Sequence, residues 1–120
     1  MRYFYDTEFL ENGKTIELIS IGIVCEDGQE YYAVNSEVDF DDVKAHNWLL
    51  HNVVPFLPII DRETLDRFFA TTSHPRPSVE WVKLDVTDSC VKPRQVIANE
   101  VRDFLLVGDK PELWAYYAAY

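Results

Sequence analysis

The chain has 120 residues, of which 48% are hydrophobic, so it is long enough for one domain with a substantial core and too short for two. With a net charge of −10, the protein alone is not expected to bind nucleic-acid phosphates through a broad positively charged surface. Any nucleic-acid chemistry would therefore depend on bound cations.

Targeting and redox signals are those of a cytoplasmic protein. The first residues lack the charged and apolar regions of a signal peptide, and the most apolar later stretch, residues 53–60, is interrupted by Pro55 and Pro58, so we expect no membrane contact. Cys25 and Cys90 lack the spacing of a zinc site and are expected to be thiols in a reducing compartment.

The first expected element is an aromatic strand that ends in two acids, Asp6 and Glu8. Because side chains on a strand alternate, both carboxylates should lie on one face, with Thr7 on the other. Two such charges repel, which either raises one pKa or requires a cation, and carboxylate oxygens suit Mg²⁺ or Mn²⁺. Acids that merely end a strand in water are the commoner case. The apolar pair Phe9 and Leu10 that follows favours a metal site instead.

Two hairpins are predicted next. Residues 11–14 contain an Asn-Gly pair that suits a tight turn, and residues 15–25 form a strand that is apolar on both alternating faces, as expected when both are covered. Asp-Gly at 27–28 marks a second turn before a strand at 30–34. The first third of the chain therefore predicts an antiparallel three-stranded meander.

The middle of the chain predicts short helices. The acids of residues 37–42 suit a solvated helix start better than a calcium loop, and Trp48, which we expect in the core, follows with apolar residues at helical spacing as far as Pro55. Residues 61–70 predict a further helical turn or two, with Leu65, Phe68 and Phe69 inward. Residues 73–78 are a loop, Trp81 is expected in the core, and residues 79–90 suit either a strand or irregular chain.

The last third predicts a helix and a strand. Pro93 suits the first helical turn, Ile97 begins an apolar series at helical spacing, and Gly108 ends the helix. Residues 112–120 are aromatic and nearly uncharged, which indicates a buried strand or a strand-to-helix passage. The elements together predict an α/β fold, a sheet with helices packed on it.

Five segments resemble a known family: Asp6-Thr7-Glu8, TIELISIGIV at 15–24, the Gly28 hairpin, the helix at 97–106, and Leu-Trp-Ala-Tyr at 113–116. They are similar to the DEDD superfamily of 3′-5′ exonucleases, and most similar to the small mycobacterial-type 3′-5′ exoribonucleases, in which the opening MRYFYDTEF followed by IELISIG is characteristic. The resemblance covers residues 1–56 and 92–120. Residues 61–91 are interpreted as a family-specific insertion.

The resemblance implies a ribonuclease H-like mixed sheet, an antiparallel meander followed by a parallel strand, with flanking helices. It also implies a site in which four acids hold two Mg²⁺ or Mn²⁺ ions and hydrolyse phosphodiester bonds from the 3′ end of single-stranded RNA. Asp6 would bridge the two metals, and Glu8 would hold the one nearer the attacking water. The backbone and side chains of Thr7, Phe9 and Leu10 would receive the terminal nucleotide.

The sequence departs from the family pattern after its last strand. In the family the third acid follows the segment matching residues 114–120, and the general-base histidine and fourth acid lie further on. Asp103 and Asp109 are not credible substitutes, and His46, His51 and His74 are assigned surface or core-edge roles.

We therefore expect a single domain, residues 1–120, that is incomplete at its C-terminus and inactive as a nuclease by itself. The alternative is a non-catalytic remnant or a nucleic-acid-binding module on the same fold. Self-association into a homodimer stays open, because a sheet edge left unpaired favours association. The pairs Tyr31-Tyr32 and Tyr116-Tyr117 could stack bases. We prefer a structural role, because adjacent aromatic residues on a strand usually bury one ring and expose the other.

Overall fold

The computed structural model describes residues 1–11, 13–70, 80–108 and 110–115, without the side chains of Phe68 and Phe69. The chain forms two compact units. One consists of Met1–Val38 with Ser89–Tyr120 and contains the sheet, and the other is Asp39–Asp88.

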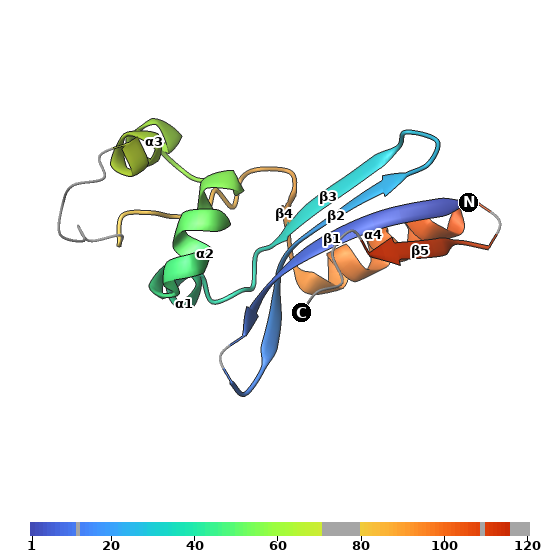
Figure 1. The fold of residues 1–120 in the computed structure, drawn as a ribbon, viewed down its shortest axis with the longest axis horizontal. Coiled ribbons are helices and arrows are strands. Elements are labelled where there is room, and N and C mark those ends of the chain that lie inside the picture. The colour runs from blue at the N-terminus through green and yellow to red at the C-terminus, as the bar shows by residue number, and fades with distance from the viewer. Residues whose placement is uncertain (12, 71–79, 109, 116–120) are drawn as a thin grey trace. The chain divides into compact units, whose positions relative to one another are not determined.

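The first unit contains a five-stranded mixed sheet (Figure 1). Its strands are β1 (Arg2–Glu11), β2 (Ile16–Cys25), β3 (Glu30–Asn35), β4 (Val91–Lys92) and β5 (Glu112–Ala115), in the order β4-β3-β2-β1-β5. β2 pairs antiparallel with both β1 and β3, whereas β4 pairs parallel with β3 and β5 pairs parallel with β1. The predicted α/β fold, a meander followed by a parallel strand, is confirmed.

Both predicted hairpin turns carry a glycine with positive φ. Gly13 has φ +86° and Gly28 has φ +94°, a backbone region in which a side chain would be strained. In the second turn the Asp27 carboxylate accepts a hydrogen bond of 2.9 Å from the Gln29 amide, which closes the loop.

The helix α4 (Arg94–Leu106) packs against one face of the sheet, as predicted. Pro93 lies at its N-cap rather than in its first turn. Tyr3 stands edge-on to Phe104 with ring centroids 5.6 Å apart. The residues packed together there are Tyr3, Ile23 and Cys25, with Tyr5, Ile21, Tyr31, Val101, Phe104 and Leu105 around them.

Burial differs from the prediction at two places in the sheet. β2 was expected to be covered on both faces, but Ile16 is 65% and Val24 is 44% exposed. The closing segment was expected to be buried, yet Leu113 is 54% and Trp114 is 48% exposed. Within the described residues β5 is an edge strand that pairs with β1 alone, so hydrophobic composition there does not report burial.

The second unit is helical, as predicted. It contains α1 (Phe40–Ala45), α2 (Asn47–Asn52), the 3₁₀ turn η1 (Val54–Phe56) and α3 (Arg62–Ala70). Residues 80–90 are irregular apart from a bridge between Ile59 and Leu84, which resolves the ambiguity in the sequence. Buried residues include Val43, Leu49, Leu50, Val53, Val54, Leu57, Leu65 and Val82.

Details of this unit both confirm and correct the prediction. The Asp39 carboxylate caps α1 by accepting a hydrogen bond from the Asp42 amide at 3.2 Å, so the acidic patch is a helix start. Leu65 is buried, while the side chains of Phe68 and Phe69 lie outside the described part. Trp48 and Trp81 were expected in the core but are 50% and 37% exposed.

Candidate metal centre

Asp6 and Glu8 occupy alternate positions in the middle of β1. Asp6 pairs with Gly22 and Glu8 pairs with Ser20, and the ladder is regular between them. Side chains alternate along a strand, and Tyr3 and Tyr5 of β1 pack with residues of α4. The Asp6 and Glu8 carboxylates therefore project from the opposite face of the sheet.

A β-bulge follows the acid pair. The register shifts between Glu8 and Phe9, so that Phe9 pairs with Leu18 and Ile19 becomes the extra residue on β2. A bulge bends the strand and increases its local twist, and bulges are over-represented beside active sites. The acid pair therefore lies directly beside a bulge in β2.

The electrostatics of the pair are those of two like charges in a small space. The pKa of Glu8 is raised, first because the carboxyl is partly buried and second because of the nearby Asp6 charge. A divalent cation bound between the carboxylates would relieve that repulsion, and their oxygens are ligands that Mg²⁺ and Mn²⁺ accept. The pair therefore fits one metal ion. No group of three or more acidic, histidine or cysteine side chains suited to a metal occurs in the described residues.

The residues expected to receive the terminal nucleotide have different environments. Thr7 pairs with Ile21 and so lies on the face opposite the two acids. Leu10 is buried, which leaves only its backbone for such a contact, whereas Phe9 is 44% exposed. Their role stays a prediction.

Among the remaining acids and histidines, Asp103, His46 and His51 lie on the surface, as predicted. Asp103 is exposed on α4 and lies 3.4 Å from the Arg102 guanidinium. His46 is exposed and caps α2 by accepting a hydrogen bond from the Leu49 amide at 3.4 Å, and His51 is exposed on the same helix. Asp109, His74 and the pair Tyr116-Tyr117 lie outside the described residues.

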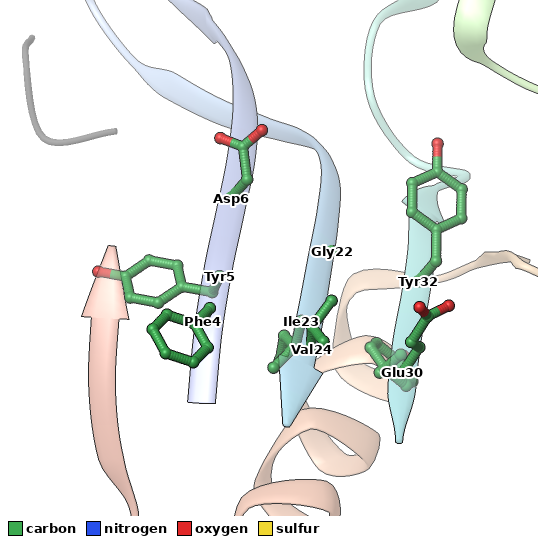
Figure 2. A pocket seen from close by; sticks show the side chains of 9 residues that line it. Phe4, Tyr5, Asp6, Gly22, Ile23, Val24, Glu30 and Tyr32 are labelled. Atoms are coloured by element: carbon green, nitrogen blue, oxygen red, sulfur yellow. The ribbon is translucent and has the colours of Figure 1, made fainter. Parts of the chain in front are cut away.

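The structure contains a hollow beside Asp6 that the sequence analysis did not predict. Its volume is about 320 Å³, and Figure 2 shows Asp6 on β1 and Tyr32 on β3 with Gly22 on the strand between them. It is lined by Phe4, Tyr5, Asp6, Gly22, Ile23, Val24, Glu30, Tyr31 and Tyr32. A glycine inside a strand was the one available signal, because it marks a place where another group can approach the backbone.

The chain is similar to two curated proteins of Mycobacterium tuberculosis, each named a 3′-5′ exoribonuclease, one from strain CDC 1551 / Oshkosh and one from strain H37Rv. Each is 43% identical over 122 aligned residues, covering 100% of this chain and 56% of the relative. The resemblance to mycobacterial-type 3′-5′ exoribonucleases is confirmed. No family model matches the sequence.

The similarity to these two proteins covers more of the chain than the sequence motifs indicated, because the alignment also includes residues 61–91. The chain nonetheless spans little more than half the length of these relatives. In the described residues no helix has the length and apolar character needed to cross a membrane.

Proposed function

We propose that Asp6 and Glu8 are the first two acids of a metal-dependent 3′-5′ exoribonuclease that hydrolyses single-stranded RNA. The observation that carries the proposal is the pair itself: two carboxylates on one face of β1, with the pKa of Glu8 raised partly by Asp6. The 43% identity to proteins named 3′-5′ exoribonucleases supports the reaction class.

The roles of the two acids are those that the resemblance implies. Asp6, which is exposed, and Glu8, which is half-buried, would both hold Mg²⁺ or Mn²⁺. Bound metal would supply an activated water and charge stabilisation for the leaving oxygen. The chain's contribution is to fix both carboxylates on a paired strand, where backbone hydrogen bonds limit their movement.

We propose further that the third and fourth acids and the general base come from residues beyond these 120. The matched relatives are considerably longer than the chain, which supports this arrangement. Groups that act as one catalytic unit fail together when one is removed, so the 120 residues alone should not trim RNA.

The test is a labelled oligoribonucleotide incubated with the complete gene product in Mg²⁺ or Mn²⁺. We expect stepwise shortening from the 3′ end that EDTA stops and that Asp6→Asn reduces by at least about a thousandfold. Asp103→Asn is the matched control and should retain activity, because Asp103 is an exposed acid on α4. Shortening that persists in EDTA or in Asp6→Asn would refute the metal-site proposal.

The same assay separates the alternative of a binding module. RNA that the complete gene product retains in a mobility-shift gel without shortening it would support that alternative. We also propose a cytoplasmic location, a reducing compartment in which Cys25 and Cys90 would stay as thiols. Self-association through the edge strand β5 is a separate proposal that gel filtration would test.

A further inference from the structure

The bulge in β2 is hydrogen-bonded to a buried side-chain amide on β3. Asn35, the last residue of β3, is 1% exposed, and its Nδ2 donates a hydrogen bond of 2.9 Å to the Leu18 carbonyl. Leu18 adjoins the extra residue of the bulge, Ile19. The regular pairing of β2 with β3 reaches only as far as Ser20 and Val34. The Asn35 side chain therefore connects the two strands beyond the point where their backbone pairing stops.

Both ends of the Asn35 amide are used. Its Oδ1 accepts a hydrogen bond of 2.9 Å from the Glu37 amide, where the chain turns away from β3. The Glu37 carboxylate in turn accepts a hydrogen bond of 2.7 Å from the Arg94 amide, at the start of α4. A buried amide is costly unless it is hydrogen-bonded, and a fully bonded one favours a single arrangement of its neighbours. Asn35 therefore fixes the bulge relative to the end of β3.

The apolar pattern of the first hairpin does not by itself select the bulged register. Without the bulge, Phe9 would pair with Ile19. Leu10 would pair with Leu18, so apolar residues would lie opposite each other in either arrangement. Such a slip would move Leu18 along β1 by one residue, about 3.4 Å, and away from the Asn35 amide. The hydrogen bond from Asn35 therefore favours the register that contains the bulge.

The bulge matters for the metal centre because it adjoins one of the two acids. Glu8 and Ser20 form the last regular pair before the register shifts, whereas Asp6 and Gly22 pair inside the regular ladder. A bulge increases the local twist of the strands, so the direction of the Glu8 carboxylate relative to Asp6 depends on it. Mg²⁺ requires nearly ideal octahedral geometry, while Ca²⁺ accepts a looser one. A change in the bulge should therefore affect Mg²⁺ more than Ca²⁺.

We propose that Asn35 is a positioning residue for the metal centre. Its amide stabilises the β2 bulge through the Leu18 carbonyl, and the bulge sets the direction of the Glu8 carboxylate toward an ion shared with Asp6. Asn35 itself contacts neither the ion nor the RNA. This inference rests on the proposed function, because it assigns Asn35 a role only if the two acids bind a metal ion.

The test measures ion affinities of the complete gene product through the electron paramagnetic resonance signal of free Mn²⁺, with Mg²⁺ and Ca²⁺ as competitors. Only the site that is lost when Asp6→Asn and Glu8→Gln are combined is counted. Asn35→Leu nearly keeps the size of the side chain and removes both hydrogen bonds. We expect its Mg²⁺ affinity to fall about tenfold and its Ca²⁺ affinity to fall less than about threefold.

Two further variants separate positioning from stability. Leu105→Ala removes a side chain that packs on the α4 face of the sheet, so it should lower stability and leave both ion affinities within about twofold of the wild type. Asn35→Ser keeps a hydroxyl donor and leaves room for a water molecule that can bridge to the Leu18 carbonyl. It should recover most of the Mg²⁺ affinity that Asn35→Leu loses.

The outcomes distinguish the two proposals. If combining Asp6→Asn with Glu8→Gln removes no ion site, the proposed function and the positioning role both fail. If that site exists but folded Asn35→Leu binds Mg²⁺ as the wild type does, or loses Mg²⁺ and Ca²⁺ affinity equally, only the positioning role is overturned. Should Asn35→Leu not fold, Asn35→Ala is judged by the same two affinities.

Discussion

At the scale of residues, the acid pair on β1 links the proposed metal binding to the stability of the fold. Folding raises the pKa of Glu8, so its ionised form is less favourable in the folded chain than in the unfolded one. The penalty is absent below the pKa of the unfolded chain and complete above the raised pKa. A bound metal ion would remove this penalty, because it favours the ionised carboxylates. This behaviour is expected of carboxylates that bind a ligand and do not stabilise the fold.

Glu8→Gln should therefore stabilise the metal-free protein at neutral pH. We expect the free energy of unfolding to rise by about 0.5 kcal/mol at pH 7, the size typical of partly solvated charge pairs, and not to rise near pH 3. Urea denaturation in EDTA measures it. A variant less stable than the wild type at pH 7 would show that Glu8 supports the fold instead.

The pKa of a second carboxylate, Glu100, shifts in the opposite direction to that of Glu8. Glu100 on α4 accepts hydrogen bonds from the Tyr31 hydroxyl at 2.9 Å and from Lys92 Nζ at 2.5 Å, so one carboxylate connects β3, β4 and α4. The hydrogen bonds from Lys92 and Tyr31 lower the pKa of Glu100. Burial raises the pKa of Tyr31, and the hydrogen bond to the charged Glu100 raises it further.

Glu100→Gln should cost stability in a pH-dependent way. A lowered pKa means that the ionised carboxylate contributes stability above the pKa of an unfolded glutamate, roughly 4.3, and that this contribution is lost as the pH falls through the lowered value. The difference in unfolding midpoint between wild type and variant should be largest near pH 7 and shrink below pH 4. An equal difference at both pH values would contradict the ionic role.

At the scale of elements, pattern predicts most of the sheet. The sequence predicts strands β1, β2 and β3 from their apolar patterns and from the turns at Gly13 and Gly28. It predicts α4 from the helical spacing of apolar residues that begins at Ile97. Strand β4 has two residues, too few for any periodicity, and the bulge at Glu8 depends on cross-strand register, which no local pattern contains.

Burial and the site are harder to predict than the elements. The exposure of Trp114 depends on its position at a sheet edge, which is a property of topology and not of composition. Asp6 and Glu8 could be placed on one face by alternation alone. The hollow at Gly22 could not be predicted from the sequence. It depends on the pairing of three strands, which places Asp6, Gly22 and Tyr32 in one row across the sheet.

Two adjacent leucines on α4 test how the helix holds to the sheet. Leu105 packs against the cluster around Tyr3 and Ile23, whereas Leu106 is 63% exposed. Leu105→Ala should lower the free energy of unfolding by about 2 kcal/mol, while Leu106→Ala should change it by less than about 0.5 kcal/mol. Equal losses by thermal or urea denaturation would mean that α4 is rotated from the orientation described.

At the scale of the whole molecule, a net charge of −10 makes a cation central to any use of RNA. The phosphate backbone would be repelled by the protein alone, and the acid pair on β1 supplies a place where a divalent ion can reverse that repulsion locally. The similarity to proteins named 3′-5′ exoribonucleases supports this proposed use of a divalent ion.

The central claim, that Asp6 and Glu8 hold a divalent ion, is tested most directly by adding substoichiometric Mn²⁺ to the ¹⁵N-labelled chain. Paramagnetic broadening falls off steeply with distance from the ion. We predict that amide signals of Asp6, Glu8 and their cross-strand partner Gly22 disappear first, and that Asp6→Asn with Glu8→Gln abolishes this loss. Broadening centred instead on the acids at the start of α1, or unchanged in the double variant, would contradict the account.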